Sequence, residues 1–216
     1  MSTELDQLLI LSSDSEFEGK LAALRSDMLE AARFSGSESQ QNRTVIEVLD
    51  EIGTRGDEAV AAYTKKFDKV ALRPEAFRVT QEALSAAHEG VDATLLASLR
   101  QAIDNVRSYQ SKIFLGHYSA FSEGTGIRFT PVRRIGVCVP GASAPLPSTV
   151  IMTVVPALVA GVKEIVVVSP PRYEGGIHPV ILAVCHELGV QEVYRIGGVQ
   201  DIGALACGTQ SIAKVD

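Results

Sequence analysis

A short run of β-forming residues that ends in a loop of proline, glycine, alanine and serine constrains the fold more than any other stretch. The run is Ile135–Val139, and it lies within RRIGVCVPGASAPLPS, residues 133–148. In a chain of alternating strands and helices, such a loop lies at the carboxyl end of a strand, where open parallel sheets bind ligands. We therefore expect a strand followed by a binding loop.

The residues after this loop alternate between helical and β-forming patterns. In chain order, the expected elements are a strand at 135–139, a helix at 148–159, a strand at 164–169, a helix at 178–188, a strand at 192–196 and a helix at 200–207. Ser148 is suited to cap the first helix, and Gly161, Gly189 and Gly208 are suited to end the three helices. This alternation predicts a right-handed, doubly wound parallel sheet, which is an α/β fold.

The first of these helices conflicts with local propensity. Residues 149–156, TVIMTVVP, are rich in β-branched side chains that favour a strand, and Pro156 removes one helical hydrogen bond. Neighbouring parallel strands, however, need a crossover of about a dozen or more residues, and no other segment supplies one. We therefore predict a helix.

The first 126 residues show helical periodicity instead of this alternation. Asp57 and Asp92 are suited to cap two of the helices, and the Ser-rich stretch at 35–41 has a disordered composition. The expected elements are helices at 16–34, 44–52, 57–67 and 92–113 and a short strand at 77–80. We predict a helical amino-terminal region, 1–126, as part of a split domain, and an α/β domain, 127–216.

Charge and composition argue against several functional classes. The formal net charge is −6 at pH 7 and no basic block is present, so nucleic acid is not an expected partner. The longest apolar stretch, 149–162, is too short to span a bilayer, and the start MSTELDQ lacks the pattern of a signal peptide. We expect a cytoplasmic protein without a membrane segment. The three cysteines, which lack metal-ligand spacing and suit a reducing compartment, are Cys138, Cys185 and Cys207.

Five motifs occur in order between residues 140 and 216: PGxSAPxxST, AGVKEI, SPP, GGxQ and GTxxxxKVD. Upstream of them lies VIEVLDEIGTRGDEAVAAYTKKFD. Together these segments resemble the histidinol dehydrogenase family from Asn42 to Asp216. The ordered combination is far more specific than a single glycine motif.

The resemblance implies a homodimeric enzyme that uses zinc and NAD to oxidise L-histidinol through the aldehyde to L-histidine, in the last steps of histidine biosynthesis. It also implies that residues 127–216 form an incomplete Rossmann-like domain that binds NAD. By position, Gln200 matches a family residue that contacts NAD. Cys138 stands where the family usually has an NAD-contacting tyrosine, and it offers neither a ring face nor a phenolic hydroxyl.

The cofactor-binding candidates are therefore Cys138, Pro140, Gly141, Gly198 and Gln200. A tight strand-to-helix turn also explains Gly197-Gly198, which lacks a full GxGxxG motif. Ser148 is a candidate substrate contact, although a helix start explains it as well. We expect structural roles for the scattered histidines, which are His88, His117, His178 and His186.

The resemblance places the family's zinc ligands and its Glu-His acid/base pair in a later part of the enzyme. We therefore expect no catalytic or zinc-binding residues in this chain and no turnover of histidinol by it alone. Two alternatives stay open. The chain is a non-catalytic protein that keeps the fold to dimerise or to bind a nucleotide, or it is a relative that oxidises another polar alcohol.

Overall fold

The structure is a computed structural model of the 216-residue chain, and it describes residues 15–33, 40–116, 119–122, 125–141 and 144–216. The chain forms two compact units, Met1–Glu47 and Val48–Asp216. The first unit contains α1 (Phe17–Arg33) and the start of α2 (Gln40–Arg55). Both predicted helices are confirmed, and α2 extends beyond the expected 44–52 at each end. Residues 35–39 of the Ser-rich stretch lie outside the described residues.

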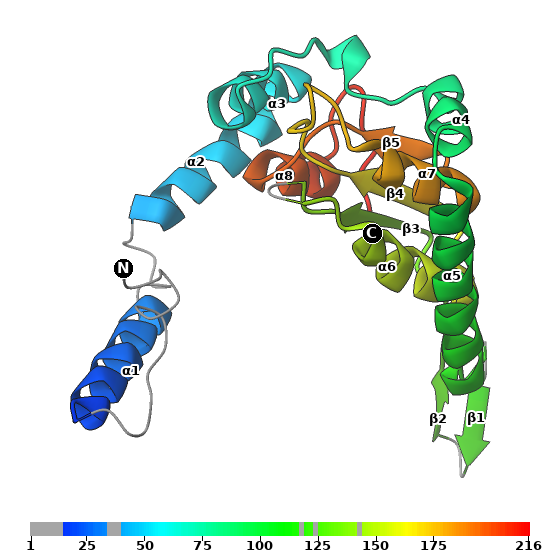
Figure 1. Cartoon of the computed structure of the whole chain (residues 1–216), viewed down its shortest axis with the longest axis horizontal. Helices are drawn as coiled ribbons and strands as arrows, with labels where there is room; N and C mark the ends of the chain where they lie inside the picture. The colour runs from blue at the N-terminus through cyan, green and yellow to red at the C-terminus, as the bar shows by residue number, and fades with distance from the viewer. Residues whose placement is uncertain (1–14, 34–39, 117–118, 123–124, 142–143) are drawn as a thin grey trace. The chain divides into compact units, whose positions relative to one another are not determined.

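Three parallel strands form the centre of the second unit (Figure 1). They are β3 (Arg134–Cys138), β4 (Glu164–Val168) and β5 (Glu192–Tyr194), in the spatial order β3-β4-β5. Two helices supply the crossovers, α6 (Pro147–Val159) from β3 to β4 and α7 (Pro179–Glu187) from β4 to β5. The predicted alternation of strands and helices is confirmed.

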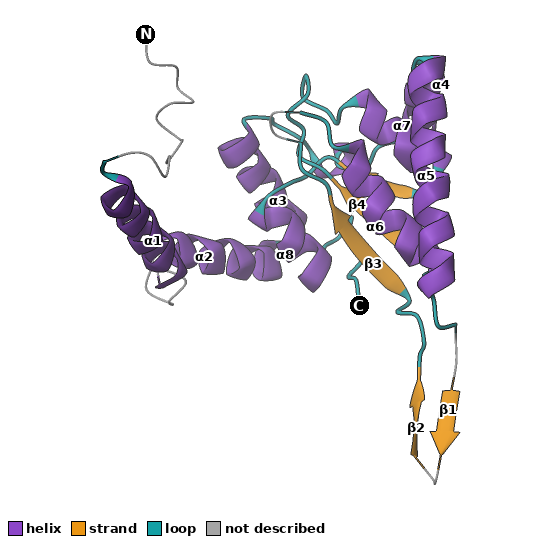
Figure 2. Ribbon diagram, turned by 60° about the horizontal axis from the view of Figure 1, so that its bottom comes forward, coloured by secondary structure: helices purple, strands orange, loops and turns teal. Residues whose placement is uncertain are grey.

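Helices cover both faces of this sheet (Figure 2). Because side chains alternate along a strand, Val167 and Val193 pack on one face with α6 and α7, whereas Val166 and Tyr194 pack on the other. The first face is also covered by α4 (Gln81–Glu89) and α5 (Ala93–Ile113), and the second by α3 (Asp57–Tyr63) and α8 (Val199–Cys207). Residues that precede the sheet in the chain thus complete its core. The predicted boundary between a helical region, 1–126, and an α/β domain, 127–216, stays a prediction.

Burial explains why α6 is helical despite its β-branched sequence. Val150, Ile151, Val154 and Val155 are all buried, and their spacing places them on one side of a helix. The helix begins at Pro147, whose ring fixes φ near its helical value, and its N-cap residue is Leu146. The prediction that Ser148 caps this helix is therefore wrong.

The other predicted helix boundaries have mixed outcomes. The Asp92 carboxylate caps α5 by accepting hydrogen bonds from the amides of Thr94 and Leu95, at 3.0 and 3.1 Å. Asp57, in contrast, is the first residue of α3, and Gly56 is its N-cap. Asp57 is buried and accepts a hydrogen bond from the Ser211 hydroxyl, a distant contact that its local sequence does not reveal. The prediction that glycines end three of the helices is confirmed. Gly161, Gly189 and Gly208 have positive φ angles of 83°, 69° and 78°, the left-handed backbone that glycine adopts after a helix.

The expected short strand at 77–80 is wrong as a strand, because these residues form only a single isolated bridge beside the outer edge of β5. Arg78 forms an antiparallel bridge with Tyr194, and the amide of Val79 donates to the Val193 carbonyl at 2.8 Å. The predicted helix 57–67 ends as an α-helix at Tyr63 and continues as the π-helical turn η2 (Thr64–Asp68). Three further features were not predicted: the helix α4, the 3-10 turn η3 (Pro74–Ala76) and the antiparallel hairpin of β1 (Ser119–Ser122) and β2 (Thr125–Arg128).

Arg134 joins the amino ends of the three parallel strands. Its side chain is 3% exposed, and its guanidinium contacts Glu164 Oε2 at 3.0 Å and both carboxylate oxygens of Glu192 at 2.8 and 2.9 Å. These hydrogen bonds raise the pKa of Arg134 above its usual value and lower the pKa of each carboxyl. The network therefore holds β3, β4 and β5 in register at this edge.

Replacing Arg134 with methionine should lower the free energy of unfolding by about 2–4 kcal/mol at pH 7, because Glu192 would lose its hydrogen-bonded cation and Glu164 would keep only the exposed Arg133. Arg133→Met is the control, since the Arg133 side chain is 60% exposed and also pairs with Glu164. That change should cost less than about 1 kcal/mol. Urea denaturation measures both, and equal losses in the two variants would contradict the prediction.

Candidate cofactor-binding site

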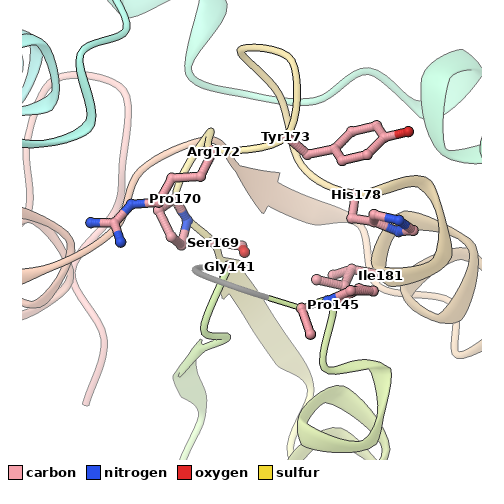
Figure 3. A pocket seen from close by; sticks show the side chains of 9 residues that line it. Gly141, Pro145, Ser169, Pro170, Arg172, Tyr173, His178 and Ile181 are labelled. Carbon is pink, nitrogen blue, oxygen red and sulfur yellow. The ribbon is translucent and has the colours of Figure 1, made fainter. Parts of the chain in front are cut away.

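The carboxyl ends of the parallel strands, opposite Arg134, enclose a small pocket (Figure 3). The pocket has a volume of about 80 Å³ and lies between the loop after β3 and the loop after β4. Its polar and apolar lining includes Gly141, Ser169, Arg172, Tyr173, His178 and Ile181. A concave surface therefore lies at the loop after β3, where the sequence predicts a binding loop.

Hydrogen-bond donors line this pocket. The Ser169 hydroxyl is fully buried and has no hydrogen-bond partner among the described residues. His178 caps α7 by accepting a hydrogen bond from the amide of Val180 at its Nδ1, so its Nε2 carries the proton in the neutral ring. The Tyr173 ring packs edge-on against this imidazole, with 4.5 Å between the centroids. Such a lining suits a ligand that is rich in oxygen acceptors.

Glycines allow the three carboxyl-end loops to approach one another. A Cβ atom on Gly141 would lie 3.0 Å from Pro170 Cγ, and one on Gly197 would lie 2.7 Å from Pro170 Cδ and closer still to its Cβ. Because a proline ring and its backbone move little, larger residues at either position would push the loops apart. Pro170 of the loop after β4 therefore contacts the loops after β3 and β5.

A second polar group lies beside the pocket at the start of α8. The Gln200 side chain is buried, and its Nε2 donates to Asp68 Oδ2 at 3.1 Å. The other oxygen of Asp68 accepts from Arg172 Nε at 2.8 Å, and Arg172 also lines the pocket. Gln200 Oε1 is buried without a hydrogen-bond partner in the described part of the chain. Buried polar atoms normally have partners, so this oxygen marks a position that a ligand donor would satisfy.

Asp68 and Arg172 were not among the residues predicted for the site. Asp68 ends the π-helical turn η2, and its side chain is 1% exposed although charged. Asp68 and Gln200 are 132 positions apart in the sequence. Nothing in the spacing of the residues indicates that this turn contacts the start of α8. Only the burial of a charged residue after an amphipathic helix would have indicated a role, and burial is a tertiary property.

Cys138 and Asp201 form a third contact at this edge. The Cys138 thiol donates to Asp201 Oδ1 at 3.7 Å, although the cysteine residue as a whole is exposed. Burial of the sulfur and the neighbouring carboxylate raise the pKa of Cys138 to about 12, so the thiol is not a nucleophile at neutral pH. Burial, with a smaller effect from Asp68, raises the pKa of Asp201 to about 7.

The structure therefore brings most of the sequence candidates to one edge of the sheet. Gly141 lines the pocket, exposed Pro140 precedes it, and exposed Gly198 lies next to Gln200 with φ of 80°. Ser148 is exposed in the first turn of α6 and is not among the pocket residues. Its substrate role stays a prediction.

The histidines that the structure describes have packing or capping partners. His88 Nε2 lies 2.6 Å from Glu187 Oε2, and Arg100 binds the other oxygen of that carboxylate at 2.7 Å. The His186 ring packs against His88 with 4.7 Å between centroids, and His117 lies outside the described residues.

Among the described residues, no group of three or more His, Cys, Asp or Glu side chains is arranged to hold a metal ion. No helix in that part of the chain is long and apolar enough to cross a membrane.

Comparison with protein families decides the relationship that the motifs suggested. A family model described as histidinol dehydrogenase matches residues 31–216. The chain belongs to the histidinol dehydrogenase family. It is 43% identical over 185 residues to the histidinol dehydrogenase of Geobacillus kaustophilus, a match that covers 84% of this chain and 43% of that protein. It is 40% identical over 180 residues to that of Bacillus subtilis, covering 82% of this chain and 42% of the relative.

The fold agrees with a solved member of the family. The crystal structure of histidinol dehydrogenase from Elizabethkingia anophelis matches with a TM-score of 0.74 at 35% sequence identity. The match covers 84% of this chain and 42% of that chain. The α/β fold class is thereby confirmed, and the chain spans less than half the length of each of these histidinol dehydrogenases.

The raised pKa of Asp201 predicts a destabilising charge at alkaline pH. An acid whose pKa rises from 3.8 to about 7 on folding is stabilising when protonated, so unfolding becomes easier as the pH rises through this range. Asp201→Asn should therefore raise the free energy of unfolding by about 1–3 kcal/mol at pH 8. The gain should shrink toward pH 5.

Urea denaturation at pH 8, 6.5 and 5 measures this effect. Asp104→Asn is the control, since Asp104 is exposed on α5, and it should change stability little at any of the three values. A gain for Asp201→Asn that is equal at pH 8 and pH 5 would show that the charge of Asp201 is not its cause.

Proposed function

We propose that this chain is the NAD-binding part of a histidinol dehydrogenase, an oxidoreductase that converts L-histidinol to L-histidine in histidine biosynthesis. The observation that carries the proposal is the buried, unpartnered Oε1 of Gln200 at the carboxyl edge of the sheet. The resemblance of the sequence to this family also implies that Gln200 contacts NAD. A nucleotide donor at this position would satisfy an atom that otherwise lacks a hydrogen bond.

The charges at this edge are compatible with a dinucleotide. Gly198 and the first turn of α8 present backbone amides, which suit the negative charge of a phosphate. Two carboxylates lie close by, but Asp68 is paired with Arg172, and burial raises the pKa of Asp201 to about 7 and so favours its protonated form. Little net negative charge therefore opposes the binding of a phosphate group.

The side chains of this edge have separate roles in the proposal. Two NAD molecules, bound in succession, would supply the hydride acceptors, one for the oxidation of the alcohol and one for that of the aldehyde. Gln200 accepts a hydrogen bond from the cofactor and is itself held by Asp68 at 3.1 Å. The Ser169 hydroxyl supplies a hydrogen-bond donor at the pocket, Arg172 holds Asp68 in place, and Tyr173, which is 43% exposed, offers a ring for stacking.

The described residues do not fit a zinc ion, because no group of potential ligands is arranged to hold one. We therefore derive no step through zinc from this chain. The proposal assigns the metal and the acid/base groups to the part of the enzyme that this chain does not match. It also includes a homodimer in the cytoplasm, as the family resemblance implies. The 216-residue chain should bind NAD without oxidising histidinol.

Calorimetric titration of the purified chain with NAD tests this proposal. Gln200→Ala should weaken NAD binding by about tenfold or more, because one hydrogen bond to the cofactor is lost. Gln101→Ala is the control, since Gln101 is exposed on α5 and bonds only to Asn105 in the described structure. Saturable binding to the parent chain that the Gln200 variant retains in full would contradict the assigned site. Absence of binding by a folded parent chain would favour the non-catalytic alternative.

Cys138→Tyr should have the opposite effect. A tyrosine at the end of β3 would supply the ring face and the hydroxyl that the thiol lacks, so NAD should bind about 3- to 10-fold more tightly. Cys138→Ser is the control, because it removes the sulfur and adds no ring. The same titration measures both variants, and weaker binding by the tyrosine variant would mean that the ring blocks the site.

A further inference from the structure

One charged pair sets the direction of the hydrogen bonds around Gln200. Arg172 Nε donates to Asp68 Oδ1 at 2.8 Å, and Gln200 Nε2 donates to Asp68 Oδ2 at 3.1 Å. A guanidinium can only donate, and a carboxylate can only accept. The Asp68 side chain is 1% exposed, which leaves almost none of its surface to water. The order of donors and acceptors along these side chains is therefore fixed.

The fixed direction extends to the other end of the Gln200 amide. An amide has a donating end and an accepting end, and a partner that can both donate and accept would allow the two ends to exchange. Because the Asp68 carboxylate only accepts, the amide keeps Nε2 toward Asp68 and Oε1 on the other side. Gln200 is 1% exposed, and its Oε1 has no hydrogen-bond partner among the described residues. Asp68 therefore makes the free end of Gln200 an acceptor.

A glycine lies beside this acceptor. Gly198 is the N-cap residue of α8, has a φ of 80° and is exposed. A Cβ atom on Gly198 would lie 3.1 Å from Gln200 Oε1, which is closer than ordinary van der Waals contact. The three nearest atoms in the described structure, apart from those of neighbouring residues, would all belong to the Gln200 amide. Glycine thus leaves a position beside Oε1 that a ligand atom can occupy.

We infer, on the basis of the proposed NAD site, that Asp68 is a positioning residue that presents Gln200 Oε1 to an amino group of the bound dinucleotide. NAD carries two such groups, one in the carboxamide of its nicotinamide ring and one on its adenine ring. Both amino groups only donate, whereas the ribose hydroxyls donate or accept and do not need an acceptor of fixed direction. The pair of Asp68 and Gln200 thereby selects ligands that donate a hydrogen bond at this point.

Two analogues of NAD, each lacking one of these amino groups, test the selection. In 3-acetylpyridine adenine dinucleotide a methyl group replaces the amino group of the carboxamide, and in nicotinamide hypoxanthine dinucleotide a carbonyl oxygen replaces the amino group of adenine. Calorimetric titration of the 216-residue chain should show one analogue binding at least about tenfold more weakly than NAD, because a buried acceptor then lacks its donor. The other analogue should bind within about threefold of NAD, and the weaker one identifies the ring that Gln200 contacts.

Asp68→Asn separates positioning from a merely structural role. Arg172 still requires an acceptor, so the new amide keeps its oxygen toward Arg172 and turns its nitrogen toward Gln200. Gln200 then accepts with Oε1, and its Nε2 faces the ligand as a donor. The preference for NAD over the weaker analogue should fall to about threefold or less, because the site no longer presents an acceptor. A structural defect would weaken the binding of both ligands by the same factor and leave their ratio unchanged.

Three further variants complete the comparison. Asp68→Ala holds neither end of the Gln200 amide, and Gln200→Ala removes the amide, so both should also lose the preference for NAD. Asp104→Asn is the control, because Asp104 is exposed on α5, and it should keep the ratio of the parent chain. Urea denaturation should show that every variant used in the titrations is folded.

The outcomes distinguish the role of Asp68 from the NAD site itself. If Gln200→Ala weakens NAD binding but Asp68→Asn keeps the ratio of the parent chain, the NAD site stands and the role of Asp68 is wrong. Equal binding of NAD and both analogues by the parent chain would also overturn that role, because Oε1 would then face no amino group. A folded parent chain that does not bind NAD would overturn both the site and the role.

Discussion

The requirement to bury a parallel sheet on both faces governs the second unit. Only α6 and α7 arise from the crossovers between adjacent strands, and both lie on the same face. The opposite face would expose Val166, Val168 and Tyr194 unless other segments covered it. Helix α8 from the end of the chain, together with α3 and the second part of α2 from before the sheet, covers these residues. The helices that precede the strands in sequence are therefore part of the core that holds the cofactor edge in shape.

The two ends of the strands have different physical roles. At the amino ends, the buried guanidinium of Arg134 binds two carboxylates and fixes the relative positions of β3, β4 and β5. At the carboxyl ends, Gly141 and Gly197 allow the loops to pack against Pro170, and two buried polar atoms without a partner in the described structure lie there beside the Asp68–Arg172 ion pair. The amino ends of the strands therefore carry a stabilising ion network, and the carboxyl ends carry the candidate binding site. Open α/β sheets bind ligands at the carboxyl ends of their strands.

The buried polar atoms at the carboxyl edge connect the candidate site to the rest of the unit. Asp68 comes from the turn after α3, Arg172 from the loop after β4 and Gln200 from α8, so three distant segments meet in one chain of hydrogen bonds. Beside them, Ser169 Oγ and Gln200 Oε1 have no hydrogen-bond partner among the residues that the structure describes. In a well-packed interior such atoms lower stability, and a bound ligand that satisfies them recovers that loss. Ligand binding and the packing of α3 and α8 should therefore be coupled.

The sequence by itself determined the alternation of strands and helices from residue 134 onward, the glycine-terminated helices, the Asp92 cap and the family. These features depend on side-chain periodicity, backbone freedom and ordered motifs, which are local properties. Only the tertiary structure decided that Asp57 is buried against Ser211 instead of capping a helix, and that residues 77–79 bond to the edge of β5. It also decided that Asp68 and Arg172 support Gln200. These contacts join residues roughly one hundred or more positions apart, and nothing in the local sequence encodes such a pairing.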